Sequence, residues 1–209
     1  MFNKKILPLG AIAANCIVLW NEGSNGCWIV DPGQDADDLI AFLDEKGLSP
    51  VLVVLTHGHF DHIDAVPGLL SRWSDLPVHI GPGDIPMLGH PQNAWPPDYP
   101  LAPKPATLVA DLADGTVLSG GGISAKVLST PGHTPGSVCL YFEPEHLLLS
   151  GDTLFAGSCG RTDFPGGSMA QMRESLKRLA TLPPDTDVIA GHGMTTTIGR
   201  EVASNPYMD

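Results

Sequence analysis

A dense group of metal-ligand side chains lies between residues 57 and 62, in the pattern His57-x-His59-x-Asp61-His62. Imidazole nitrogens and carboxylate oxygens are ligands of divalent first-row cations. Because residues i and i+2 of an extended segment point the same way, His57 and His59 can converge on one ion. Asp61 and His62 come where the chain turns toward a helix, so they can face a neighbouring point. The pattern therefore predicts two metal ions a few ångströms apart.

Further candidate ligands lie far along the chain, each in a glycine-containing loop beside a short apolar run: His133, Asp152 and His192. Glycine lets two backbone segments approach closely, as a ligand cluster requires. Two metal sites need more ligands than residues 57–62 supply, so we expect these three residues to complete them. The histidines without ligand-type neighbours are expected to be solvated or locally hydrogen-bonded: His79, His90 and His146.

Alternating strands and helices are predicted to position these residues. The β-branched run Val51–Leu55 predicts a strand buried on both faces, and a helix is expected around Ile63–Trp73. A strand at Cys27–Val30 leads into Asp31-Pro32-Gly33 and a helix over 34–47, with Asp35 as its N-cap and Gly47 as its stop. Other strands are expected at 17–20, 107–109, 123–128, 138–142, 147–149 and 187–190, and a helix at 169–181. This order predicts an α/β fold with its site beyond the carboxyl ends of strands.

Composition narrows the function classes. The 209 residues suit a single domain spanning 1–209, and 23 acidic against 11 basic residues give a net charge of −12. Such a charge argues against non-specific binding to nucleic acid or an anionic membrane, and no segment reaches the roughly 18 apolar residues that span a bilayer. Eight prolines between residues 81 and 105 predict an irregular surface excursion or lid. Four cysteines do not suggest a disulfide framework, so we expect a cytoplasmic location.

The complete pattern resembles the metallo-β-lactamase-fold hydrolases and, within them, the single-domain glyoxalase II-like (hydroxyacylglutathione hydrolase) group. The resemblance runs nearly end to end, from Asn15-Cys16 to Gly191-His192-Gly193. It implies an αβ/βα four-layer sandwich, in which two β-sheets pack face to face with helices outside. It also implies a division of ligands: His57, His59 and His133 on one metal, Asp61, His62 and His192 on the other, and Asp152 bridging them.

The resemblance further implies a metal-dependent hydrolase of thioesters, above all S-acylglutathione, in which a hydroxide bridging two divalent ions attacks the acyl carbon. Asp61 and Asp152 are the expected catalytic residues. Zinc is the expected metal, with iron or manganese as alternatives. The expected partner is a small anionic thioester, with no nucleic acid and no membrane, and the chain is expected to be a monomer or small homo-oligomer.

Substrate contacts are less clearly indicated. In the glyoxalase II pattern a basic residue nine positions after the bridging aspartate helps to bind the glutathione carboxylate, and Arg161 occupies that place; the alternative role for it is an ion pair with Asp163. The group's two glutathione-contacting tyrosines fall at Asp163 and Met194, and its C-terminal helical domain is not expected here, so the chain departs from the group's glutathione-binding pattern at these points. Asp31 and Thr56 either orient the histidines or serve only turn and strand-end geometry.

The main alternative is a mono-iron persulfide dioxygenase of the same fold, because those enzymes share a segment similar to Gly160–Phe164. Zinc β-lactamases with a cysteine ligand would need Cys at position 152, and flavodiiron proteins would need Glu at position 59. RNA-processing nucleases of the fold fit poorly with the acidic charge. A metal-stabilised binding module is less consistent with a His/Asp site, since structural zinc sites are usually rich in cysteine.

Overall fold

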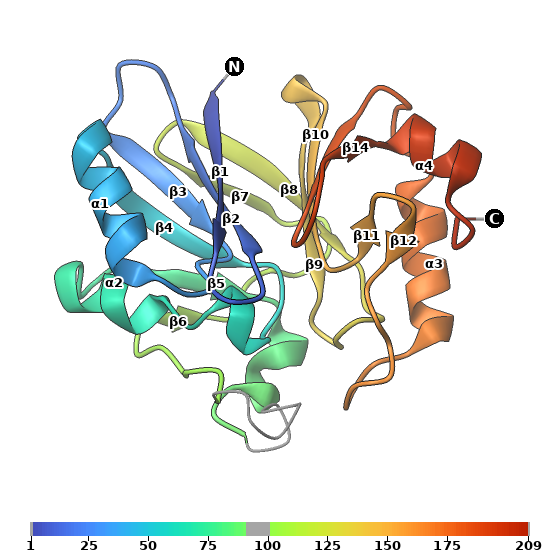
Figure 1. Ribbon diagram of the computed structural model, residues 1–209, viewed down its shortest axis with the longest axis horizontal. Helices are drawn as coiled ribbons and strands as arrows, with labels where there is room; N and C mark the ends of the chain where they lie inside the picture. The colour runs from blue at the N-terminus through green and yellow to red at the C-terminus, as the bar shows by residue number, and fades with distance from the viewer. Residues whose placement is uncertain (1, 91–100, 209) are drawn as a thin grey trace.

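Two six-stranded sheets face each other in the computed structural model, which describes residues 2–90 and 101–208 (Figure 1). The first sheet contains, in spatial order, β1 (Asn3–Leu9), β2 (Ala14–Trp20), β3 (Gly26–Val30), β4 (Ser49–Leu55), β5 (Val78–Ile80) and β6 (Leu108–Val109). The second contains β14 (Thr196–Thr197), β13 (Asp187–Ala190), β10 (Leu147–Gly151), β9 (Val138–Phe142), β8 (Ile123–Ser129) and β7 (Val117–Gly120). A separate small hairpin pairs β11 (Leu154–Phe155) with β12 (Ser158–Cys159).

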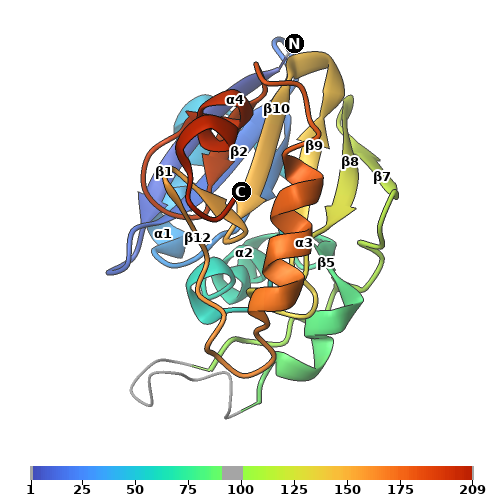
Figure 2. The ribbon, with the colours of Figure 1, turned by 90° about the vertical axis from the view of Figure 1, so that its right-hand side faces the viewer.

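Helices cover the outer face of each sheet. On the first sheet lie α1 (Ala36–Lys46) and α2 (Val66–Arg72), and on the second lie α3 (Met169–Leu179) and α4 (Ile198–Ser204) (Figures 1 and 2). Short 3₁₀ turns occur at η1 (Phe60–His62), η2 (Pro82–Met87) and η4 (Glu143–Glu145). This is the αβ/βα sandwich that the family resemblance implied.

Three apolar cores separate the four layers. Leu39 and Leu43 of α1 pack with Ile29 and Val53 on the outer face of the first sheet. Alternate residues of the same strands, such as Trp28 and Val54, pack against Leu140 and Phe142 of the second sheet. The third core joins the outer face of that sheet to α3 and α4. Because β3 and β4 bury side chains on both faces, their near-continuous apolar runs follow from their central position.

Most predicted elements are confirmed, with three corrections. Val51 is 36% exposed, so β4 is buried on both faces only from Leu52 onward. The helix expected around 63–73 is shorter, because η1 precedes it and α2 begins at Val66. Asp35 occupies the N-cap position of α1 but makes no capping hydrogen bond; its carboxylate instead accepts from the backbone N–H of Gly10.

The remaining sequence expectations concern loops and thiols. Half of the eight prolines of the 81–105 segment lie outside the described residues, at 91, 96, 97 and 100. The part before them forms η2, which packs beside the loop after His57. All four cysteines lie in the described part of the chain and are free thiols. Across residues 2–90 and 101–208, no helix is long and apolar enough to cross a membrane.

Candidate metal centre

The seven predicted ligands come together at one edge of the sandwich, where strands of both sheets end. His57 and His59 follow β4, Asp61 and His62 lie in η1, and the others follow strands of the second sheet: His133 after β8, Asp152 after β10 and His192 after β13. Parallel strands β10 and β13 place their carboxyl ends side by side. The fold therefore brings together candidate ligands that lie more than a hundred residues apart in the sequence.

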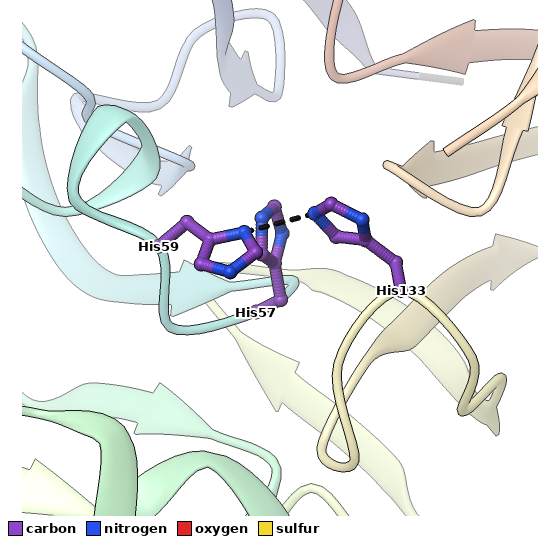
Figure 3. Close-up of side chains that lie close together, drawn as sticks. All are labelled: His57, His59 and His133. Atoms are coloured by element: carbon purple, nitrogen blue, oxygen red, sulfur yellow. Dashed lines mark hydrogen bonds between the residues drawn. The ribbon is translucent and has the colours of Figure 1, made fainter. Parts of the chain in front are cut away.

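The first group contains His57, His59 and His133, each of which offers one ring nitrogen, and these three atoms lie within 4.8 Å of one another. Figure 3 shows the two rings of the 57–59 loop facing the ring that enters from the opposite loop. Nδ1 of His59 lies 2.9 Å from Nε2 of His133. All three side chains are buried or nearly so, so the nitrogens face one another in a space with little solvent.

Hydrogen bonds on the far side of two rings fix which nitrogen is free. The Thr56 hydroxyl donates to Asp31, so Nδ1 of His57, 3.2 Å from that hydroxyl oxygen, is the donor in their contact. Nδ1 of His133 donates to the backbone carbonyl of Arg161 at 2.7 Å. Each ring therefore presents an unprotonated Nε2 to the group, and Nε2 of His57 is buried without a hydrogen-bond partner among the described residues. A lone pair left in this position suits a metal ligand.

The second group contains Asp61, His62 and His192. Nε2 of His192 lies 3.3 Å from Oδ2 of Asp61 and 3.3 Å from Nε2 of His62. On the other side of the His62 ring, Nδ1 lies 3.0 Å from Oδ2 of Asp31. The ligand atoms of this group therefore face one another, while the second nitrogen of His62 faces a carboxylate, as is usual for metal-binding histidines.

Asp152 lies between the two groups. Its Oδ2 is 3.6 Å from Nε2 of His133 and 3.6 Å from Nε2 of His192, so one oxygen faces a member of each group. Its Oδ1 is 3.5 Å from Nε2 of His62 and has no hydrogen-bond partner in the described part of the chain. This position is the one that a bridging ligand between two ions requires.

Burial and neighbouring charge set the protonation of the groups in opposite directions. Burial, with the neighbouring charge of His133, lowers the pKa of His59 to about 3, and burial also holds the pKa of His57 well below its usual value. Burial disfavours the charged form of His62 too, but Asp61, Asp31 and Asp152 outweigh it and raise its pKa to about 10. His57 and His59 are therefore held in the neutral form, which is the form that binds metals, whereas the carboxylates around His62 favour its protonated form.

Glycines beside two ligands are required by close approach. A Cβ on Gly151, which has φ +48°, would lie 2.3 Å from Oγ1 of Thr56. A Cβ on Gly191 would lie 2.2 Å from Oδ1 of Asp152. These contacts agree with the prediction that glycines let the ligand loops approach one another.

Asn15, on the first sheet, also holds the loop that carries His192. Its side-chain amide donates to the carbonyl oxygens of Ala190 and Gly193, which lie on either side of His192.

Asp84 is a buried residue of the site region that sequence reasoning missed. Its carboxylate accepts hydrogen bonds from the N–H of Gly58, the N–H of Gly136 and the hydroxyl of Thr134. It therefore joins the loop carrying His57 and His59 to the loop carrying His133. Burial raises its pKa although these hydrogen bonds oppose the shift. Its partners lie 26 to 52 residues away, so no local sequence signal marked it.

Arg161 lies beside the first group, and its side chain makes the ion pair that the sequence left as an alternative. Its guanidinium donates to Asp163 through Nε at 2.8 Å and through an Nη at 2.7 Å. Two of the three histidines expected outside the cluster make local contacts elsewhere: His79 contacts Asp111 and His146 contacts Asp185.

Residues 9–192 match the sequence profile of the metallo-beta-lactamase superfamily. The chain belongs to this superfamily. The resemblance deduced from the ligand pattern is thereby confirmed, and the four-layer fold is that of the metallo-beta-lactamase fold. The chain is 32% identical to GloC, a hydroxyacylglutathione hydrolase of Haemophilus influenzae. The match covers 99% of this chain and 98% of GloC.

Solved structures of the superfamily are also similar over the whole chain. The crystal structure of BLEG-1 B3 metallo-beta-lactamase matches with a TM-score of 0.90 and 38% identity, covering 99% of both chains. TTHA1623 in a di-iron-bound form matches with a TM-score of 0.84 and 37% identity, covering 97% of this chain and 99% of its own. ETHE1 from Myxococcus xanthus matches with a TM-score of 0.77 and 27% identity, covering 99% of this chain and 83% of ETHE1.

Proposed function

We propose that this protein is a metal-dependent hydrolase of thioesters and that S-acylglutathione is the first substrate class to test. The observation that carries the proposal is the position of Asp152, whose Oδ2 lies 3.6 Å from a histidine of each ligand group. Hydrolysis at paired metals is chemistry that such a bridged site supports. The similarity to GloC favours a thioester over other hydrolysable groups.

His57, His59 and His133 would hold one ion, Asp61, His62 and His192 the other, and Asp152 both. When bound, two divalent ions would supply Lewis acidity toward the acyl carbonyl and lower the pKa of a water molecule. Nitrogen and carboxylate donors suit zinc, which we propose as the resident metal, with iron or manganese as alternatives. The di-iron form of TTHA1623 keeps iron among the metals to measure.

The protein's own carboxylates would then orient the two metal ions and neutralise part of their positive charge. Asp152, facing both ligand groups, and Asp61, facing His192, would fix the separation of the two positive centres and balance their charge. A protein nucleophile is not needed, and the buried thiols are poor candidates: burial raises the pKa of Cys27 to about 12 and that of Cys139 to about 11. A thiolate is expelled from a thioester without help from a strong general acid. This fits a site built from candidate metal ligands alone.

The decisive experiment combines metal counting with three assays on the purified holoenzyme. Ions per chain are counted by mass spectrometry, and the same sample is tested for hydrolysis of S-lactoylglutathione, for oxygen uptake with glutathione persulfide and for hydrolysis of a cephalosporin. Two ions per chain with thioester hydrolysis support the proposal. One iron per chain with oxygen uptake and no hydrolysis would establish the persulfide dioxygenase alternative instead. Cephalosporin hydrolysis alone would show a β-lactamase.

A further inference from the structure

The Arg161–Asp163 pair lies beside the first ligand group. The backbone carbonyl of Arg161 accepts the hydrogen bond from Nδ1 of His133, so this residue is fixed one bond away from a candidate ligand. Its guanidinium carbon lies 3.8 Å from the centre of the Phe164 ring. The Phe164 ring in turn contacts that of His59 edge to face, with centroids 5.8 Å apart. The guanidinium is therefore at the margin of the centre and not on a remote surface.

Asp163 binds this guanidinium in the geometry that a substrate carboxylate would use. Both carboxylate oxygens accept, one from Nε and one from an Nη, at 2.8 and 2.7 Å. Parallel hydrogen bonds of this kind are the preferred mode of carboxylate recognition by arginine. The hydrogen bonds from Arg161 lower the pKa of Asp163 to about 2, so its carboxyl group is ionised at any assay pH. Both side chains are more than half exposed, so a dissolved anion can reach them.

We infer that Asp163 is a specificity-determining residue, an internal carboxylate that competes with the carboxylates of the substrate for Arg161. The inference rests on the proposed function, because it concerns which thioesters that site accepts. A thioester with a carboxylate on its thiol part, such as S-acylglutathione, must displace Asp163 before it can bind the Nε–Nη edge of Arg161. A thioester of a neutral thiol does not make this exchange. Asp163 therefore weakens selection for substrates with an anionic thiol part. Removal of the Asp163 carboxylate, with Arg161 kept, restores that selection.

Binding of non-hydrolysable ligands tests the inference without relying on turnover. The Kd of S-hexylglutathione is measured by calorimetry on the metal-loaded wild type and on Asp163→Asn, with Asp163→Ser as a second variant. S-hexyl-N-acetylcysteamine serves as the neutral ligand. Asp44→Asn is the matched control, since Asp44 forms an exposed ion pair with Arg72 at 2.7 Å elsewhere on the molecule. Exposed pairs are weak, so we expect the Asp163 variants to bind S-hexylglutathione about two- to fivefold more tightly.

Other outcomes separate competition from unrelated effects. The Kd of the neutral ligand should not change in any variant, and Asp44→Asn should resemble the wild type with both ligands. The gain in affinity for S-hexylglutathione should disappear in the Arg161→Ala/Asp163→Asn double variant and shrink in high salt. An unchanged Kd of S-hexylglutathione in both Asp163 variants, or a gain that survives loss of Arg161, would overturn the inference. If no thioester is hydrolysed, the proposed function fails, but these binding results still decide the role of Asp163.

Discussion

The carboxylate of Asp31 holds His62 from the side opposite to the ligand group: its Oδ2 lies 3.0 Å from Nδ1, while Nε2 of the same ring faces Asp61, Asp152 and His192. The same oxygen accepts from the Thr56 hydroxyl, which contacts His57. Of the two roles that the sequence left open for Asp31 and Thr56, the structure therefore shows contacts that orient histidines. One carboxylate fixes a ring in each group.

Replacement of Asp31 by asparagine should weaken metal binding. The amide keeps the shape but loses the negative charge beside His62. Its NH₂ group must also replace one of two accepting oxygens, of which one accepts from the N–H of Thr56 and the other from its hydroxyl. Loss of such a supporting carboxylate typically costs 10- to 100-fold in metal affinity. The measurement is a competition titration of the loaded protein with a fluorescent chelator, with Asp44→Asn as control. Equal affinities of Asp31→Asn and wild type would show that the contact has no orienting role.

Replacement of Asp152 by alanine should remove activity and metal retention together. Its Oδ2 faces both ligand groups, so under the proposed function the variant loses the carboxylate that both sites share and leaves the histidines of both groups without their common counter-charge. We expect fewer than one ion per chain after dialysis and a loss of thioester hydrolysis of at least about 10³-fold. Metal analysis and the hydrolysis assay are run on one preparation. A variant that retains two ions but is inactive would give Asp152 a role other than bridging.

The long central strands were predicted from the sequence for a physical reason. Central strands such as β3 and β4 are nearly continuous apolar runs because neighbours cover both faces. Among the strands that the sequence missed, β1 and β7 are edges of their sheets, and β1 has a mostly exposed or half-buried pattern; β5, which lies inside its sheet, has only three residues. Pro8 lies within β1, and an edge strand tolerates proline because one side of its backbone is unpaired.

The candidate ligands could be predicted because their residue types and glycine neighbours are local features of the sequence. The contacts around them could not, because they join distant segments. Asp84 reaches Gly136 across 52 residues, and Asn15 reaches Ala190 across 175. The sequence likewise left two roles open for Arg161, and only the folded loop shows its guanidinium paired with Asp163.

Asp84→Asn should destabilise the fold and loosen the first ligand group. Both oxygens of Asp84 accept hydrogen bonds, so the NH₂ group of asparagine must face a buried N–H or hydroxyl donor. An unsatisfied buried polar group costs about 1–3 kcal/mol, which urea denaturation should show as a lower free energy of unfolding. Because Gly58 lies between His57 and His59, metal retention should fall as well. Asp111→Asn, at a more exposed acid, is the control; a variant as stable as this control would contradict the role.

The Asp114–Arg178 pair gives a prediction for pH. A hydrogen bond from Arg178, with another from the N–H of Ser129, holds the pKa of Asp114 below its usual value. A group whose pKa is lower in the folded state contributes stability above its unfolded pKa of about 3.9, and that contribution is lost as pH falls through the folded pKa. The pair is about half exposed, so the contribution at pH 7 should be below about 1 kcal/mol.

Asp114→Asn should therefore reduce the free energy of unfolding at pH 7, and the difference from the wild type should shrink steadily below pH 4. Urea denaturation of both proteins at pH 7, 5, 4 and 3 measures it. Because solvent screens the pair, the difference at pH 7 should also shrink in 0.5 M salt. A difference that stays constant across pH and salt would mean that Asp114 acts only as a neutral hydrogen-bond acceptor for Ser129 and that its charge contributes nothing.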